Sequence, residues 1–223
     1  MRITLDEAAI GHGLGADVPP LSITVTDGVP TAIAVEGDEQ PLLVSVLLGG
    51  RTKNSSGRVL IDGREDTDEL RTRTALVDTP WVAEPTAGIA LATIVSEEFA
   101  FASLPSSGRA VKSFLAEHGL ADYAALPIRS LPAADRTRMF SELAALRDGV
   151  DALIVTSPER HGGWPHEWFG ALTEIAARGL AVVIVTDAAT AQILIRLGAR
   201  DGYAPLPEPQ PESEPDSTES SPR

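Results

Sequence analysis

The stretch from Asp151 to Asp187 reads DALIVTSPERHGGWPHEWFGALTEIAARGLAVVIVTD and decides the fold class. It contains two unbroken apolar runs, Ala152–Thr156 and Ala181–Thr186. Between them, Pro165–Arg178 has helical periodicity and ends at Gly179. Continuous apolar strands separated by a helix are typical of a parallel sheet that is covered on both faces. The stretch therefore predicts an α/β protein.

Outward from this stretch, the rest of the chain is rich in strands first and in helices afterwards. Alternating apolar residues between turn signals predict the strands, and apolar positions at helical spacing predict the helices. One segment, Pro41–Leu48, fits either a buried helix or a strand. The expected strands are Arg2–Ala8, Leu21–Thr26, Thr31–Val35, Arg58–Asp62 and Thr74–Asp78, and the further helices are Ile89–Ala102, Ser107–His118, Ala133–Leu146 and Ala188–Leu197.

Composition excludes several classes of protein. The 223 residues carry a formal net charge of −14 and contain no cysteine, so a disulfide framework, a thiol nucleophile and a zinc ribbon are all excluded. The acidic balance argues against nucleic-acid binding and against adsorption to an anionic membrane. No apolar run approaches the roughly 20 residues of a spanning helix, and no signal peptide is recognisable. We therefore expect a cytoplasmic protein without direct membrane insertion.

The C-terminal segment, residues 204–223, differs in composition from the rest. It reads APLPEPQPESEPDSTESSPR, with six prolines, five acidic residues and one arginine. Leu206 is its one large apolar residue, so burial cannot offset the entropy of ordering it. We expect a disordered acidic tail, which leaves residues 1–203 as the folded body.

Short motifs follow one another in a distinctive order along that body. Gly57–Gly63 (GRVLIDG) matches a G-x-V-x-x-D-G strand, and Ala75–Asp78 is a strand followed by a loop. Ser130–Arg136 stands at the head of a helix, and Thr173–Asp187 forms a helix, a glycine turn and a strand. Leu47–Arg51 looks like the end of the helix that follows a phosphate loop. Taken in the order in which they occur along the chain, these segments resemble those of the ATP-binding subunits of ABC transporters.

The resemblance implies a particular architecture and particular partners. The fold would be a P-loop-NTPase-like α/β domain over residues 1–203, with a mostly parallel core sheet, an N-terminal antiparallel subsheet and a helical subdomain at about residues 82–146. The partner would be a membrane permease-like protein or a second ATP-binding subunit, with a dimer as one expected assembly. In the family, a surface equivalent to Thr79–Glu98 receives the permease. The resemblance therefore places the chain at the inner face of the membrane, through that partner.

The phosphate-binding motif of the family is degraded in this chain. A Walker A loop needs G-x-x-x-x-G-K-[ST], because glycine backbone amides wrap the phosphates, Lys reaches the β- and γ-phosphates, and Ser or Thr holds Mg²⁺. The matching stretch begins at Gly37 and continues with Asp38, Glu39, Gln40 and Pro41. Both acids would repel a polyphosphate, and the proline lacks an N–H group. The chain has two lysines, Lys53 and Lys112, and neither follows a glycine.

The other nucleotide motifs are altered as well. The Walker B Asp and Glu positions hold Thr156 and Ser157, the glutamine-loop position holds Asp78, and the switch-histidine position holds Asp187. The signature L-S-G-G-Q is replaced by the Leu131–Asp135 sequence LPAAD. We therefore expect no catalytic residue and no metal site. Gly37 and Asp78 are weak candidates for cofactor binding, with ATP and Mg²⁺ possible cofactors if the degraded site still binds.

Two other motifs favour ordinary loops. The stretch His161–Glu167 (HGGWPHE) contains two histidines, but their spacing matches no common metal site and Glu167 suits the first turn of a helix. The stretch Gly11–Ala16 (GHGLGA) formally fits a dinucleotide fingerprint, but Pro19 and Pro20 prevent the helix that such a site requires.

Three functions remain open from the sequence. The first is a catalytically inactive cassette subunit, a pseudo-ATPase that acts as a structural or regulatory partner of a membrane protein. The second is a working ABC ATPase that energises transport with atypical motifs. The third is a small α/β binding module unrelated to transport.

Overall fold

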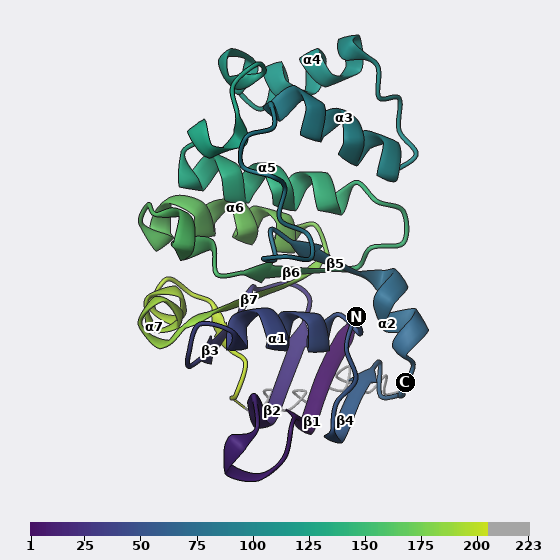
Figure 1. The fold of residues 1–223 in the computed structure, drawn as a ribbon, viewed down its shortest axis with the longest axis vertical. Coiled ribbons are helices and arrows are strands. Elements are labelled where there is room, and N and C mark those ends of the chain that lie inside the picture. The colour runs from purple at the N-terminus through teal and green to yellow at the C-terminus, as the bar shows by residue number, and fades with distance from the viewer. Residues whose placement is uncertain (205–223) are drawn as a thin grey trace, which may run out of the picture.

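The computed structural model describes residues 1–204. The disordered tail that we expect at 204–223 lies outside the described residues, apart from Ala204. Two sheets form the centre of the molecule, with helices between and around them (Figure 1). Among the described residues, no helix is long and apolar enough to cross a membrane.

The core is a five-stranded parallel sheet in the order β5-β6-β7-β3-β8. Side chains of successive residues point to opposite faces, so both faces of this sheet are apolar and buried. In the central strand, Val182 and Ile184 pack with the helices of one face, and Val183 and Val185 pack with the elements of the other. The strands are β3 (Thr31–Val35), β5 (Thr74–Val77), β6 (Ala152–Thr156), β7 (Ala181–Asp187) and β8 (Arg200–Asp201).

The second sheet is antiparallel, in the order β2-β1-β4. It consists of β1 (Arg2–Ile10), β2 (Val18–Thr26) and β4 (Ser56–Ile61). Helix α1 (Gln40–Leu48) lies between the two sheets, and its Val44, Leu47 and Leu48 are buried there. The ambiguous segment at 41–48 is therefore a helix, which is buried on most of its surface.

The remaining helices cover the other face of the parallel sheet or stand beyond it (Figure 1). Helices α5 and α6 pack against the sheet and each other, while α3 and α4 pack together above α5. Their bounds are α3 (Leu91–Phe101), α4 (Gly108–Glu117), α5 (Ala133–Ala145), α6 (Pro165–Ala177) and α7 (Ala188–Arg196). The predicted α/β class, with its parallel core sheet and N-terminal antiparallel sheet, is confirmed.

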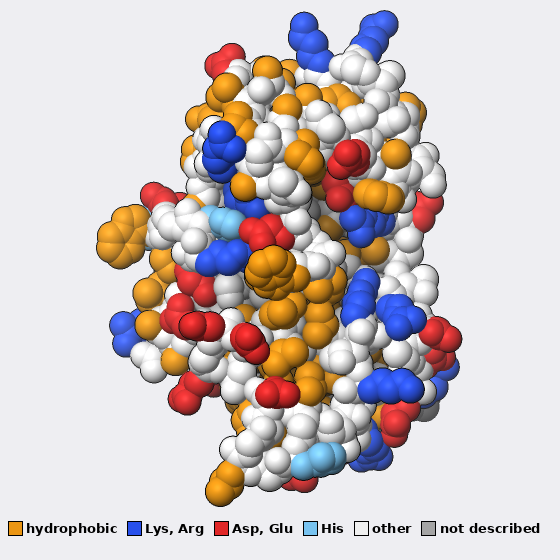
Figure 2. All heavy atoms as spheres, viewed as in Figure 1, with side chains coloured by type: hydrophobic (Ala, Val, Ile, Leu, Met, Phe, Trp, Pro, Cys, Tyr) orange, Lys and Arg blue, Asp and Glu red, His pale blue; other side chains and the backbone are white. Residues whose placement is uncertain are grey.

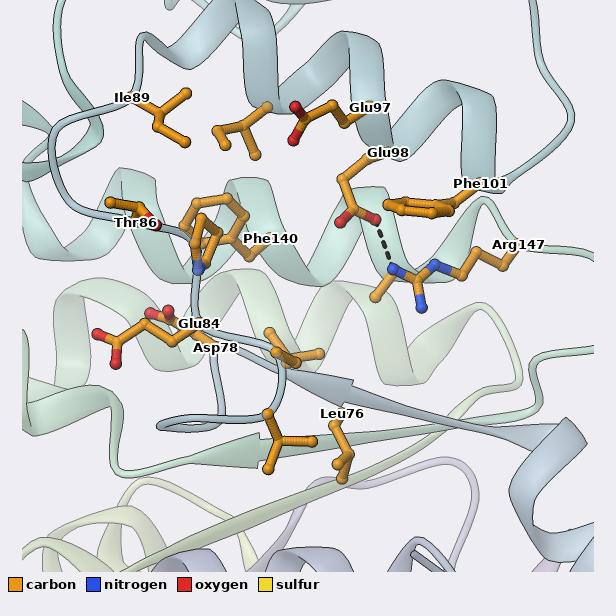
Figure 3. A pocket seen from close by; sticks show the side chains of 16 residues that line it. Leu76, Asp78, Glu84, Thr86, Ile89, Glu97, Glu98, Phe101, Phe140 and Arg147 are labelled. Carbon is orange, nitrogen blue, oxygen red and sulfur yellow. Dashed lines mark hydrogen bonds and ion pairs between the residues drawn. The ribbon is translucent and has the colours of Figure 1, made fainter.

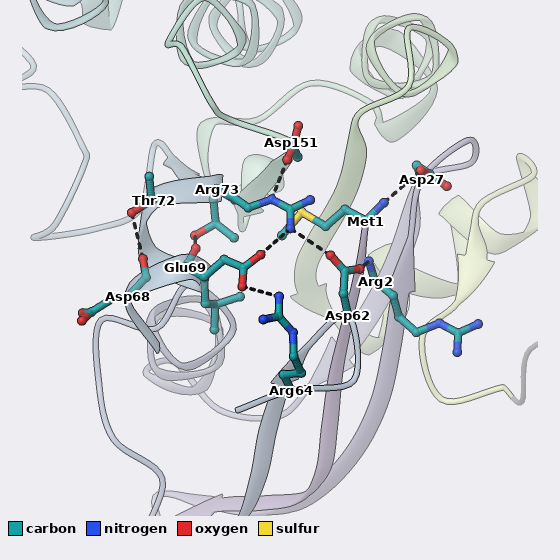
Figure 4. Close-up of polar contacts among 12 residues, drawn as sticks. Met1, Arg2, Asp27, Asp62, Arg64, Asp68, Glu69, Thr72, Arg73 and Asp151 are labelled. Atoms are coloured by element: carbon teal, nitrogen blue, oxygen red, sulfur yellow. Dashed lines mark hydrogen bonds and ion pairs between the residues drawn. The ribbon is translucent and has the colours of Figure 1, made fainter. Parts of the chain in front are cut away.

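A short helix that the sequence analysis did not predict, α2 (Thr67–Arg73), joins the two sheets. Asp66 caps its first turn by accepting the Glu69 N–H at 2.8 Å. At its end, the Arg73 guanidinium binds Asp62, Glu69 and Asp151 at 2.6–2.8 Å (Figure 4). Hydrogen bonds to these carboxylates, that of Asp151 foremost, raise the pKa of Arg73. One cation thus connects the end of β4 to the start of β6.

The GRVLIDG motif has a structural explanation. Gly57 lies where β4 faces an irregularity in β1, at which the register shifts between Asp6 and Ala9. Its φ is +70°, and a Cβ atom there would lie 2.1 Å from the Glu7 carbonyl oxygen. Gly63 also has a positive φ, +81°, but open space surrounds its Cβ position. The first glycine therefore permits close approach of two backbones, whereas the second serves the turn alone.

We predict that Gly57→Ala lowers the free energy of unfolding by about 3 kcal/mol or more, because both an unfavourable φ and a backbone overlap must be relieved. Gly63→Ala is the matched control and should cost about 1 kcal/mol, from the left-handed backbone alone. Urea denaturation followed by circular dichroism measures both. Equal losses for the two variants would contradict this assignment of the first glycine.

Candidate functional site

The carboxyl ends of β3, β6 and β7 meet at one edge of the parallel sheet, as is usual for ligand sites in α/β folds. A pocket of about 600 Å³ opens at this edge. The structure brings Gly37, Thr156, Ser157 and Asp187 together in its wall, and these are four of the positions that the resemblance singled out. The other lining residues are Val35, Asp38, Glu39, Pro41, Leu42, Pro80, Trp81, Glu159 and Arg160.

The loop from β3 to α1 supplies carboxylates where a phosphate loop supplies N–H groups and a lysine. Gly37 has a φ of +82°, which lets the chain turn, and the exposed Asp38 and Glu39 follow it. The Glu36 N–H is bound by the Gln40 side-chain oxygen at 3.1 Å. Pro41 stands in the first turn of α1 and has no N–H to offer. The loop therefore repels an anion and gives it few donors.

Arg160 is the one cationic side chain among the described residues that line this pocket, and it is already bound. Its guanidinium donates to the backbone oxygens of Thr156 and Asp78 at 2.7 and 2.6 Å. It also forms ion pairs with the carboxylates of Glu84 at 3.1 Å and Asp78 at 3.4 Å. Because its N–H groups are used in this way, Arg160 connects the segments that follow β5 and β6 and is poorly placed to bind a phosphate.

Behind the pocket, a buried ion-pair cluster is centred on Asp78, which follows β5 and is 6% exposed. The guanidinium of Arg136, on α5, donates two hydrogen bonds of 2.7 Å each to the Asp78 carboxylate. Arg136 itself is 4% exposed. His161 Nε2 lies 2.8 Å from the same carboxylate. Burial raises the pKa of Asp78, but contacts with His161, Arg136 and Arg160 outweigh it, so the pKa lies well below its usual range.

Three of these residues could in principle hold a cation. Ligand atoms of Asp78, Glu84 and His161 lie within 4.8 Å of one another. However, Arg136 and Arg160 already approach the carboxylates of Asp78 and Glu84. Since two guanidinium groups supply the positive charge there, the donor set fits an internal ion-pair cluster better than a metal site.

Hydroxyl groups replace charge at the end of β6. Thr156, which the resemblance assigned to the position of the Walker B aspartate, donates a hydrogen bond to the Ser45 hydroxyl of α1 at 2.8 Å. Its hydroxyl oxygen also lies 2.7 Å from that of Thr79. All three side chains are buried, and the chain of hydroxyls connects the ends of β5 and β6 with α1. This arrangement is neutral and internally satisfied, so it holds strands together without offering a ligand to Mg²⁺.

The two remaining acids at this edge differ in role. Asp187, which the resemblance assigned to the switch-histidine position, caps α7 by accepting hydrogen bonds from the N–H and the hydroxyl of Thr190 at 2.8 and 3.0 Å. Glu159 lies in the short turn after β6, where burial raises the pKa of its carboxyl. Asp187 is therefore used structurally, and its D-x-x-T spacing is a cap signal that is visible in the sequence.

Several functional residues could not have been found from the sequence. Asp78 is a candidate from the sequence, but its partner Arg136, which directly follows the LPAAD stretch, is not. The two residues are 58 positions apart, and no local pattern connects them. The same applies to Arg160 and Glu84. His161, which we interpreted as part of an ordinary loop before a helix, belongs to the cluster as well.

Comparisons with known proteins give one sequence relative and many structural ones. No family model matches the chain. A biotin transport ATP-binding protein, BioM, from Rhizobium etli is 26% identical over 101 residues. The match covers 45% of this chain and 43% of that protein, so it spans less than half the length of the relative.

Solved structures match over most of the chain at low identity. An ATP-binding subunit of an ABC transporter has a TM-score of 0.61 at 16% identity, covering 87% of this chain and 83% of its own. A nucleotide-free ATP-binding cassette from an ABC transporter gives 0.63 at 14%, with 86% and 84% covered. CbiO1 of Clostridium perfringens, described as part of the ABC transporter complex cbiONQ, gives 0.58 at 18%, with 83% and 78% covered. The chain therefore has the fold of the ATP-binding subunits of ABC transporters.

Proposed function

We propose that this chain is an ABC-type cassette subunit that does not hydrolyse ATP and acts as a structural or regulatory partner of a membrane protein. The observation that carries the proposal is the sheet edge, where carboxylates, hydroxyls and bound arginines occupy the positions that nucleotide and Mg²⁺ would need. Phosphoryl transfer depends on positioned cations around the phosphates. Within the described residues of the pocket wall, the single cation, Arg160, is held by other protein groups.

The ion-pair cluster stabilises this edge of the sheet. It ties the end of β5 to α5 and to the turn at 158–161 through the groups of Asp78, Arg136 and Arg160. Removing one partner from such a buried cluster strongly destabilises the fold, because the remaining partner is left as an unpaired buried charge. It holds the helices of residues 82–146 on the sheet without a bound nucleotide. That range, within the single domain 1–203, is the helical subdomain of the proposed architecture.

A second hollow offers a place for the partner. It has a volume of about 410 Å³ and lies between the segment at 78–89, α3 and α5 (Figure 3). Phe101 and Val82 line it and are 72% and 52% exposed. Its wall also carries acids, among them Glu84, Glu97 and Glu98, the last paired with Arg147 at 2.6 Å. Exposed apolar groups in a hollow mark contact surfaces.

We infer that this hollow, which overlaps the surface at 79–98, receives a cytoplasmic segment of a permease-like protein and so places the chain at the inner face of a membrane. CbiO1, which shares the fold, is described as part of a transporter complex. A second ATP-binding subunit is the other candidate partner. A working ATPase is the less favoured function, because no nucleotide-contacting motif is intact. An unrelated α/β module is disfavoured by the coverage of the structural matches.

If the cluster holds this edge together, Asp78→Asn should lower the free energy of unfolding by about 3 kcal/mol at pH 7, because two arginines lose their buried carboxylate. The folded pKa of Asp78 lies below its unfolded value of about 3.9, so its contribution is complete above that pH and falls as the carboxylate protonates. The difference in the free energy of unfolding between the two proteins should thus narrow below about pH 4. Asp68→Asn, at a side chain 96% exposed, is the control and should change little. A gap as small as that of the control would refute the role of the cluster.

ATP should bind more weakly than about 1 mM, the upper end of ordinary KM values, and should not be hydrolysed in the presence of Mg²⁺. Calorimetric titration and a phosphate-release assay on the purified full chain measure the two quantities. A hydrolysing ABC cassette handled in parallel shows that the conditions are adequate. Micromolar binding with Mg²⁺-dependent turnover would overturn the proposed inactivity.

Affinity purification from detergent-solubilised membranes should recover a multi-span membrane protein with the wild-type chain. The double variant Val82→Asp, Phe101→Asp should lose it, since charges in the hollow of Figure 3 oppose desolvation. Ile195→Asp, on the exposed face of α7, is the matched control and should retain it. Recovery of soluble proteins alone, or equal recovery by both variants, would count against this docking surface.

A further inference from the structure

The pocket at the carboxyl edge of the sheet is lined in part by apolar side chains and by one tryptophan. Val35, Pro41, Leu42 and Pro80 contribute apolar groups to its wall. Trp81 stands at the same pocket and is 94% exposed, so the faces of its indole are free. Figure 2 shows hydrophobic side chains gathered in the middle of this face of the molecule, with acidic side chains to one side of them. An exposed indole above an apolar hollow is a common feature of contact surfaces.

The same pocket also carries unbalanced negative charge. Asp38, Glu39, Glu159 and Asp187 all line the pocket. Neither Asp38 nor Glu39 forms an ion pair within the part of the chain that the structure describes, and both are exposed. The guanidinium of Arg160 is already shared among four oxygens. The pocket that replaces a phosphate site thus has the polarity for a cation.

The chemistry selects one kind of occupant. A guanidinium group can stack on an indole, donate to several carboxylates at once and lay its methylene stem on an apolar floor. We propose that this pocket receives an arginine side chain from a basic protein segment. Loops on the cytoplasmic side of membrane proteins carry an excess of Lys and Arg, which complements this acidic edge. Naming the segment as a loop of the membrane partner rests on the function proposed above.

This pocket is separate from the hollow of Figure 3. The segment from Asp78 to Glu84 contributes to both, since Pro80 and Trp81 line the pocket and Val82, Ala83 and Glu84 line the hollow. A partner that fills the hollow has this pocket next to it, across a single short segment. The arginine would therefore add a charge-dependent contact to an apolar one, and it would make association sensitive to salt.

The pocket can be tested with peptides on the full chain. The probe is the peptide Ac-Ala-Arg-Ala-Arg-Ala-NH₂, and the matched neutral peptide has citrulline in place of both arginines. Fluorescence of Trp81 reports binding in a Trp164→Phe background, where Trp168 is the other indole and is buried. We expect saturable binding of the arginine peptide that weakens with salt, and no binding of the citrulline peptide.

Variants localise the binding. Asp38→Asn and Glu39→Gln should each weaken it about two- to five-fold, the usual range for an exposed ion pair. Asp68→Asn, distant on α2, is the charge-matched control and should leave it unchanged. Trp81→Ala, followed by calorimetry because the reporter is lost, should also weaken binding about two- to five-fold.

Three results would overturn the inference: no binding of the arginine peptide, equal binding of the citrulline peptide, or binding of free arginine amide as tight as that of the peptide. The last would make the occupant a small molecule in place of a protein segment. If the peptide fails while a membrane protein still co-purifies with the chain, the pocket inference fails and the proposed function stands. If the peptide binds but no membrane protein is recovered, the proposed function fails and the cation pocket stands.

Discussion

The buried pair of Asp78 and Arg136 is the constraint on which this sheet edge depends. Two hydrogen bonds of 2.7 Å join a carboxylate at the end of β5 to a guanidinium on α5, and both side chains are nearly inaccessible to water. Neither charge can be buried alone at reasonable cost, so each requires the other in place. Arg160 and His161 complete the cluster from the turn after β6. Sheet, helix and turn are thereby held in one arrangement.

The chain keeps the fold of the ATP-binding subunits of ABC transporters although the residues after its strands differ from the nucleotide motifs of that family. The fold depends on apolar strands such as β6 and β7, which are buried on both faces. The chemistry of such folds resides in the few residues that follow the strands. Here those residues are used for caps, hydroxyl pairs and ion pairs, which stabilise the edge from within.

Much of the fold could be predicted from the sequence because its signals are local. Unbroken apolar runs, glycine stops and helix caps identified the strands and helices of the last third, and these elements are confirmed. The α-helix and the strand that escaped prediction, α2 and β8, are short and polar, and they owe their stability to contacts with distant residues. Arg73 at the end of α2, for example, binds Asp151, which is 78 positions away in the sequence and precedes the neighbouring strand β6. Periodicity contains no information about such partners.

For the candidate site, too, some features could be predicted from the sequence and others required the tertiary structure. The sequence by itself determined that no complete G-x-x-x-x-G-K-[ST] loop is present and that acids stand at several positions which the resemblance assigns to nucleotide contacts, because residue type and spacing suffice for that conclusion. The tertiary structure alone decided that Asp78 meets Arg136, that Arg160 is already bound, and that Trp81 stands exposed above an acidic pocket. These facts depend on distances between segments far apart in the chain. Only packing of the sheet and helices brings those segments within the few ångströms over which charges pair.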